Sequence, residues 1–285
     1  MKTNNKTNDY QISTFPQTRI AALDVVELGR KKHHIKALME LDVTDTRAAI
    51  KEYKRTTGVK LSFTAWLIKV ISAAIEEFQS AHAYLLSKRK SVIFKDIDFA
   101  VVVERIYDGQ LVPLPYVIRR CNEKSLRHIH DEIQHAKNQE LSKKDVVLGD
   151  RQYRLATELY FFLPGFLRRM MWRFVLKHPK IAKNGMGSVM LTSIGMMGRI
   201  NGWFIHSSIH PLSFGVSSIV QKPWVVDGEV TVREILNMTI LVDHDVMDGA
   251  PMARFIDYLS QSIESAMGLE DYLPKRQSPN VSKER

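Results

Sequence analysis

The stretch that says most about the fold is residues 238–250, which read MTILVDHDVMDGA. Its first five residues are β-branched or apolar, a pattern typical of a buried strand. After Pro251, whose fixed φ suits the first position of a helix, apolar side chains recur at helical spacing up to residue 263. Gly249 is expected to permit a tight turn between the two elements. The sequence therefore predicts a strand, a turn and a helix, with His244 where the strand ends.

His244 and Asp248 on this turn are candidate catalytic residues. An imidazole that is neutral near pH 7 can take a proton from a thiol or a hydroxyl, which is the task of the base in acyl transfer. Asp248 lies four residues later and is expected to orient the turn or the ring. A His and an Asp near a glycine also occur often by chance, so the pattern alone leaves a purely structural role open.

Residues 243–250 (DHDVMDGA) resemble a motif of the catalytic domain of the dihydrolipoamide acyltransferases of 2-oxo acid dehydrogenase complexes. In that family, whose fold the chloramphenicol acetyltransferases share, a strand carrying Asp-His-Arg-Val-Val-Asp-Gly-Ala leads into the last helix. The resemblance implies that His244 is a general base. Asp245 stands where the family usually has Arg, which bears on a local salt bridge rather than on the base.

Two further segments extend the resemblance. Residues 225–230 (VVDGEV) resemble the hairpin before the catalytic strand, and Asp-Gly favours a two-residue type I′ turn. Residues 189–198 (VMLTSIGMMG) are similar to the family's Thr-Ile-Ser-Asn-Leu-Gly segment, in which the first serine hydroxyl stabilises the tetrahedral intermediate. Alignment on Gly195 places Thr192 at that serine's position with Ser193 beside it, so either hydroxyl is a candidate donor. Without the resemblance, both are ordinary polar residues of a strand.

The resemblance covers roughly residues 30 to 273 and implies one α/β domain. We expect a chloramphenicol acetyltransferase-like sandwich over residues 19–273, in which helices flank a mixed β-sheet. The tails 1–18 and 274–285 are rich in polar residues and are expected to be disordered, because they cannot bury enough surface to order themselves. The expected strands are 35–43, 99–105, 111–118, 188–194, 213–221, 229–233 and 238–243, and the expected helices before the last one are 44–58, 63–78 and 125–140.

Residues 160–187 form an insert that the family pattern does not explain. It combines an apolar stripe with basic residues at Arg168, Arg169, Arg173 and Lys177. Such a helix can lie on a membrane surface or cover a substrate entrance, or it can pack on the core with its arginines in solvent. Lys180 and Lys183 are candidates for contacts with the phosphates of coenzyme A, although charge runs are usually solvated faces.

Composition narrows the possible partners and cofactors. The chain has 285 residues, 45% of them hydrophobic, and its 41 Lys and Arg against 31 Asp and Glu give a formal charge of +10. This charge suits an anionic ligand such as coenzyme A, a nucleic acid or an anionic membrane, but we find no nucleic-acid motif and expect no nucleic acid. Cys121 is the only cysteine and His128, His130 and His135 have no ligand-like spacing, so we expect no disulfide and no metal. The polar start and the lack of a long apolar run predict a cytoplasmic protein.

The resemblance implies direct acyl transfer between coenzyme A and a thiol or hydroxyl acceptor, without a covalent acyl-enzyme. It also implies a homotrimer in which the His-bearing and hydroxyl-bearing segments come from neighbouring protomers. Full-length family members carry a lipoyl domain and a subunit-binding domain for which we expect no counterpart here, so the acceptor is a separate lipoylated protein or a small molecule. The alternatives are an inactive scaffold of the same fold and a protein that binds membranes or nucleic acid through its charge.

Four further histidines are expected to lie outside the catalytic turn. His33 and His34 are expected to be structural. His206 and His210 are expected to lie in a loop, where they either line the substrate channel or are ordinary loop residues.

Overall fold

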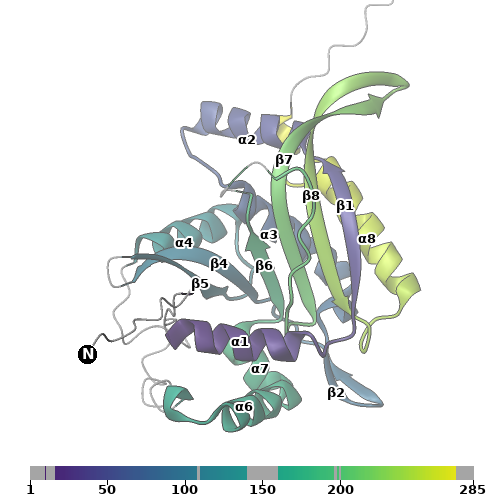
Figure 1. The fold of residues 1–285 in the computed structure, drawn as a ribbon. Coiled ribbons are helices and arrows are strands. Elements are labelled where there is room, and N and C mark those ends of the chain that lie inside the picture. Colours follow the sequence, from purple (N-terminus) through teal and green to yellow (C-terminus); the bar gives the residue numbers. More distant parts are fainter. Residues whose placement is uncertain are drawn as a thin grey trace, which may run out of the picture.

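A six-stranded mixed sheet forms the centre of the molecule in the computed structural model, which describes residues 10, 17–107, 110–139, 160–195, 198 and 200–273 (Figure 1). The strand order is β1-β8-β7-β6-β4-β5; β6 runs parallel to β4 and β7, and the other neighbours are antiparallel. A small hairpin, β2–β3, stands apart. The strands are β1 (His34–Asp42), β2 (Tyr84–Ser87), β3 (Lys90–Val92), β4 (Phe99–Tyr107), β5 (Gln110–Ile118), β6 (Val189–Ser193), β7 (Leu212–Val226) and β8 (Glu229–Asp243).

Helices cover one face of this sheet and close the core. The helices are α1 (Gln17–Gly29), α2 (Thr44–Thr57), α3 (Phe63–Glu77), α4 (Leu126–Asn138), α6 (Gly165–Lys177), α7 (Pro179–Met186) and α8 (Gly249–Glu264). Apolar residues of α3, α4 and α8 pack with the strands in one buried cluster, in which Trp66, Phe99, Phe214 and Phe255 have almost no exposed surface. This arrangement confirms the predicted α/β fold with helices flanking a mixed sheet.

Of the described helices, only α1 lies at the opposite face of the sheet, which we call the outer face (Figure 1). The segment 200–211 crosses in front of β7 and β8, and α1 runs across the lower end (Figure 1). Gly29 at the end of α1 fits so closely that an added Cβ would lie 2.9 Å from the Ser208 carbonyl oxygen. The outer face therefore keeps part of its surface open.

The long hairpin β7–β8 corrects one prediction and confirms another. The predicted strands 229–233 and 238–243 are a single strand, because the residues between them stay paired with β7 and β1. Asp227 and Gly228 have φ of 52° and 84°, the two positive values that the predicted type I′ turn requires. Helix α1 was not predicted, and it begins inside the tail 1–18 that was expected to be disordered. The rest of that tail, apart from Tyr10, and the tail 274–285 lie outside the described residues.

Strand alternation assigns the two candidate hydroxyls to different faces. Val189 and Leu191 of β6 belong to the core cluster, so Ser193 points to the core side and Thr192 to the outer face. On β8, Met238, Ile240 and Val242 point into the core, and Thr239 and Asp243 point to the outer face. Thr192 and Thr239 therefore share a face.

Helix α6 of the insert does not pack on the core as one reading of the sequence expected. None of its residues is buried, and Phe166, Met170 and Phe174 are more than half exposed. Arg168 is the side chain that turns inward, to the buried Asp24. Lys183 of α7 is also buried and paired with Asp98 at 3.0 Å, so it is not available to a phosphate as considered from the sequence. Among the described helices none has both the length and the apolar character needed to cross a bilayer.

Candidate active site

The turn that carries His244 is held by its backbone. Strand β8 lies between β1 and β7, and its last residue, Asp243, donates its N–H to the Pro211 carbonyl at 2.8 Å. The N–H of His244 donates to the His33 carbonyl at 3.0 Å, and the N–H of Met247 closes the turn by donating to the Asp243 carbonyl at 3.2 Å. The Met247 side chain is buried beneath. The backbone of His244 is therefore held by hydrogen bonds to the segments next to β1 and β7.

Gly249 does not have the role that the sequence predicted for it. It is the first residue of α8, its φ is not in the left-handed region, and an added Cβ would meet nothing within 4 Å. Pro251 is the third helical residue, not the first; there it still costs no hydrogen bond, because the first four N–H groups of a helix have no partner within it. The turn does not depend on the conformational freedom of glycine.

A buried ion pair supports the turn from below. The Asp243 carboxylate is almost fully buried and lies 2.5 Å from the Lys32 ammonium, whose side chain is 21% exposed. The other oxygen of Asp243 accepts the N–H of Asp245 at 3.3 Å. This pair was not predicted from the sequence, although a charged residue directly after an apolar strand is a recognisable signal of a buried carboxylate that needs a partner.

His244 and Asp248 are close without being hydrogen-bonded. The His244 side chain is 51% exposed, Asp248 is 87% exposed, and Nδ1 lies 3.9 Å from the carboxylate oxygen. Asp248 is the N-cap residue of α8, but its side chain makes no capping bond. Asp243, rather than Asp248, therefore stabilises the turn. The Asp248 side chain provides a negative charge close to the imidazole ring of His244.

Asp245, where the resembling family usually has Arg, ties the turn to the segment before β1. Its carboxylate lies 3.0 Å from Nδ1 of His33, and this hydrogen bond raises the pKa of His33. Both side chains are exposed, so we expect this contact to add little stability.

Thr192 and His244 of the same chain do not meet. Thr192 is in register with Gly215, and Gly215 with Thr239, five residues before His244. Five residues along a strand are roughly 17 Å and two strand spacings are roughly 10 Å, so about 20 Å separates the two residues. Neither Thr192 nor Ser193 makes a side-chain hydrogen bond with another described residue. Gly195, used to align this segment, is required sterically, because a Cβ there would lie 2.4 Å from the Ser217 carbonyl oxygen.

A buried polar strip, which was not predicted from the sequence, lies on the outer face next to Thr192. The His206 ring packs over Gly215, where an added Cβ would come 2.9 Å from its Nδ1, while Nε2 lies 2.5 Å from the Ser213 hydroxyl. Burial lowers the pKa of His206 to about 4, so the ring is neutral at pH 7. Within the described chain, several buried atoms here have no hydrogen-bond partner: His206 Nδ1, Ser217 Oγ, Thr239 Oγ1 and both amide atoms of Asn237. Such atoms normally bind water, a ligand or another chain.

Two other histidines have structural roles. The ring of His34 donates from Nε2 to the His210 carbonyl at 2.9 Å, as expected for a structural residue. His210 is buried, its Nε2 donates to the Met186 carbonyl at 2.9 Å, and burial lowers its pKa to about 4. His210 therefore connects α7 to the start of β7. In the described ranges, no three His, Cys, Asp or Glu side chains are grouped so that they could hold a metal ion.

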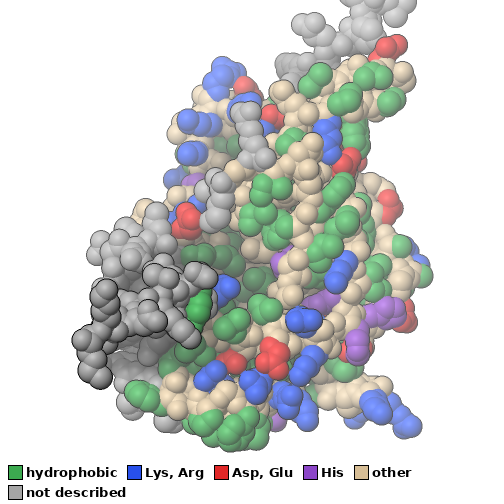
Figure 2. Space-filling view, viewed as in Figure 1, with side chains coloured by type: hydrophobic (Ala, Val, Ile, Leu, Met, Phe, Trp, Pro, Cys, Tyr) green, Lys and Arg blue, Asp and Glu red, His purple; other side chains and the backbone are tan. Residues whose placement is uncertain are grey.

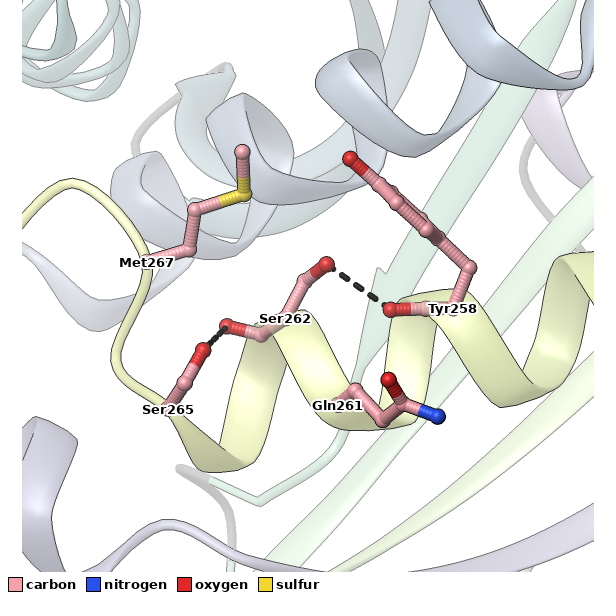
Figure 3. A pocket seen from close by; sticks show the side chains of 5 residues that line it. All are labelled: Tyr258, Gln261, Ser262, Ser265 and Met267. Atoms are coloured by element: carbon pink, nitrogen blue, oxygen red, sulfur yellow. Dashed lines mark hydrogen bonds between the residues drawn. The ribbon is translucent and has the colours of Figure 1, made fainter.

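A hollow on the described surface lies away from this turn. It measures about 360 Å³ and is lined by Tyr258, Gln261, Ser262, Ser265 and Met267 at the C-terminal end of α8 (Figure 3). The hydroxyls of Ser262 and Ser265 donate to the carbonyls of Tyr258 and Ser262, at 2.8 and 3.3 Å. His244 precedes the other end of this 16-residue helix, roughly 24 Å away. The hollow is open to solvent and brings together no base and nucleophile.

Comparison with known families identifies the chain. The family described as 2-oxoacid dehydrogenases acyltransferase (catalytic domain) matches residues 10–149 and 182–270. The chain belongs to this family. The match includes the His244 turn and Thr192, and it begins at residue 10, earlier than the predicted start near residue 30. The unmatched residues 150–181 include α6 and overlap the insert that the sequence analysis set apart.

Relatives of this acyltransferase-family chain include two Bacillus subtilis (strain 168) proteins. It is 26% identical over 239 residues to a lipoamide acyltransferase component of a branched-chain alpha-keto acid dehydrogenase complex, covering 81% of this chain and 47% of the relative. It is 25% identical over 263 residues to a dihydrolipoyllysine-residue acetyltransferase component of a pyruvate dehydrogenase complex, covering 87% and 50%. The chain thus spans about half the length of these relatives.

Solved structures of the family share the fold. A probable dihydrolipoamide acetyltransferase from Listeria monocytogenes 4b F2365 has a TM-score of 0.64 at 18% identity, covering 95% of this chain and 98% of that one. An Azotobacter vinelandii dihydrolipoamide acetyltransferase has a TM-score of 0.63 at 20% identity, with the same coverage. That enzyme was solved to investigate the role of a serine, a histidine and an asparagine in its catalytic mechanism.

Proposed function

We propose that this chain transfers an acyl group between coenzyme A and a thiol or hydroxyl acceptor, with His244 as the general base. The observation that carries the proposal is the geometry of His244: a half-exposed imidazole on a turn whose backbone is fixed by β1 and β7, within the matched part of the family. In the Azotobacter enzyme the histidine and the asparagine investigated are four residues apart, the spacing of His244 and Asp248 here. We propose that the Asp248 carboxylate stabilises the positive charge that the His244 ring gains when it takes up a proton.

The proposed reaction is direct transfer. His244 removes the proton from the acceptor, and the resulting thiolate or alkoxide attacks the thioester carbonyl carbon of the acyl-coenzyme A. A hydroxyl donates a hydrogen bond to the oxyanion of the tetrahedral intermediate. When the intermediate collapses, the bond between carbon and the coenzyme A sulfur breaks, and the imidazolium returns its proton to the leaving thiolate. His244 ends neutral, and no acyl group is attached to the protein.

Thr192 is the better candidate for the oxyanion donor. Its side chain points to the outer face, which a second chain can approach, whereas Ser193 points to the side of the sheet that packs on helices. The buried polar strip of His206, Ser217 and Thr239 lies on the same outer face as Thr192. We therefore assign the donor role to Thr192 and a structural role to Ser193.

About 20 Å separates Thr192 from His244 within one chain, so a site that uses both residues would take them from different copies of the chain. We propose a homotrimer in which the outer face of one subunit meets the His244 turn of the next. Exposed apolar side chains support this, because they form a surface that a soluble monomer would normally cover. They lie on the outer face, on segment 200–205 and on the tip of the β7–β8 hairpin: Leu38, Ile200, Trp203, Ile205, Val225, Val230 and Val232.

The proposed acceptor is a dihydrolipoyl group on a separate protein or a small thiol or alcohol. The test is to incubate the purified protein with acetyl-coenzyme A and dihydrolipoamide, and to follow both thioesters by chromatography. Loss of acetyl-coenzyme A matched by gain of acetyl-dihydrolipoamide is the expected result. A folded oligomer that is inactive with acetyl- and longer acyl-coenzyme A and with both acceptor types would contradict the proposal and indicate the inactive scaffold.

A further inference from the structure

The lower end of the molecule presents a surface that nothing in the acyltransferase fold requires. We call it the basal surface. Its apolar part is Phe162, Phe166, Met170 and Phe174, with exposed fractions of 85%, 63%, 59% and 55%. These residues recur every four positions, so the last three lie on one side of α6. Two phenylalanines and a methionine that project from one side of a helix into solvent are unusual for a surface that has no partner.

Helix α6 is fixed so that this side faces outward. Arg168 on the opposite side donates from Nε to the Asp24 carboxylate at 2.6 Å, and Tyr160 donates its hydroxyl to the same oxygen at 2.7 Å. Trp172 donates its indole N–H to the Tyr160 hydroxyl at 3.1 Å. Asp24 belongs to α1, so this network fastens α6 to α1. The aromatic side chains therefore stay exposed because of a specific anchor, and not because the helix is loosely placed.

Positive charge surrounds the apolar part. Arg173 and Lys177 on α6 and Lys180 on α7 are exposed, and none of the three forms an ion pair with a described carboxylate. The β2–β3 hairpin, whose strand β2 lies next to α7, adds exposed Lys88, Arg89 and Lys90 together with exposed Leu85 and Leu86. Figure 2 shows hydrophobic side chains at the lowest point of this face, with Lys and Arg side chains above them and to their right.

Apolar side chains that project into solvent, bordered by exposed cations, match the chemistry of one kind of partner. We propose that the basal surface docks onto an anionic lipid bilayer. Amphipathic helices bind membrane interfaces by burying an apolar side in the headgroup region while their Lys and Arg contact anionic lipids. A second copy docked through the same surface would bring like charges together. The apolar part of the surface and Arg173, Lys177 and Lys180 lie in residues 150–181, outside the family match, whereas the β2–β3 hairpin lies within it.

The test uses sedimentation with vesicles of phosphatidylglycerol and phosphatidylcholine, and with phosphatidylcholine alone, at low salt. The charge variant is Arg173→Glu with Lys177→Glu, and the apolar variant is Phe166→Ser with Phe174→Ser. The matched control is Lys51→Glu with Lys54→Glu on α2, at the opposite end of the molecule, which changes the net charge equally (Figure 1). None of these residues lies in the His244 turn or near Thr192, and circular dichroism checks that each variant is folded.

The expected result is binding of the wild type to anionic vesicles only. Both basal variants should bind at least roughly tenfold more weakly, because each cation contributes about 1 kcal/mol near such a surface and the buried aromatic side chains a similar amount. The control should stay within about threefold of wild type, as screening weakens distant charges. Failure of the wild type to bind, equal loss in the control, or unchanged binding of the apolar variant would overturn the proposal. Self-association that the apolar variant abolishes, without vesicle binding, would assign the surface to a second copy and also overturn it.

Discussion

Lys32 and Asp243 form an ion pair of 2.5 Å directly beneath the turn that carries His244. Asp243 is the last residue of β8 and accepts the N–H of Asp245, so the pair holds the turn against the segment before β1. A buried carboxylate without a partner is costly, which makes this pair sensitive to the loss of either member. The position of the proposed base thus depends on a residue 211 positions away in the sequence.

Lys32→Met should destabilise the protein by about 3 kcal/mol, because it leaves the Asp243 carboxylate buried and unpaired. Urea unfolding at pH 7 measures the change. The control is Lys31→Met, which removes an exposed pair of 3.9 Å with Glu27 and should stay within about 0.5 kcal/mol of wild type. Asp248→Asn, an exposed change in the same turn, should behave like the control. Equal stability of all three variants would show that the buried pair does not support the turn.

His244→Ala should lower turnover by roughly 10² to 10⁴ while leaving the fold and the oligomer unchanged, because no base remains to remove the proton from the acceptor thiol or hydroxyl. Chromatography of acyl-coenzyme A and its product measures the rate, and light scattering checks the assembly. His178→Ala, at an exposed histidine after α6, is the control and should keep full activity. A His244→Ala variant as active as wild type would remove His244 from the mechanism.

Thr192→Ala should lower turnover by roughly 10² to 10³, the usual effect of removing one oxyanion donor. Ser193→Ala should have a much smaller effect, because its hydroxyl points to the helix side of the sheet. Thr192→Ser keeps a hydroxyl in place and should restore most of the rate. If Ser193→Ala were the damaging change, the assignment by strand alternation would be wrong.

Buried histidines should make the protein less stable in mild acid. Burial lowers the pKa of His82, His206 and His210 to about 4, whereas an unfolded histidine titrates near 6.5. Between these values the unfolded chain binds protons that the folded chain does not, so the free energy of unfolding falls as pH falls from 6.5 towards 4. Each histidine contributes a slope of up to about 1.4 kcal/mol per pH unit.

Urea unfolding at pH 7.0, 5.5 and 4.5 checks this expectation. His82→Gln should reduce the slope of the free energy of unfolding against pH by up to about 1.4 kcal/mol per pH unit, the contribution of one proton. His128→Gln, at an exposed histidine of α4, should leave this slope unchanged. An unchanged slope in His82→Gln would mean that His82 takes up its proton in the folded protein as readily as in the unfolded one.

Local features of the fold were predictable from the sequence. The apolar run before His244 predicted β8, the Asp227-Gly228 dipeptide predicted the hairpin turn, and alternation along β6 separates Thr192 from Ser193. These depend on residues close together in the chain. The Lys32–Asp243 pair, by contrast, depends on how β1 and β8 come together, which no local pattern contains.

The direction in which α6 faces could not be predicted for a similar reason. Its sequence has an apolar stripe and several arginines, and the stripe alone favours packing on the core. Arg168 faces inward because Asp24 of α1 is buried beneath it, and Phe166 is exposed as a consequence. Likewise, the polar strip around His206 exists because segment 200–211 crosses β7 at Gly215, a contact that depends on tertiary structure.

The central claim is that each active site combines His244 of one subunit with Thr192 of the next, and co-refolding tests it most directly. Equal amounts of the inactive variants His244→Ala and Thr192→Ala are mixed, unfolded and refolded together, and activity is compared with each variant refolded alone. In a cyclic trimer with random mixing, an interface receives both intact residues with a probability of one quarter, so roughly a quarter of wild-type activity should return. If both residues acted within one chain, every chain would lack one of them, and no activity would return.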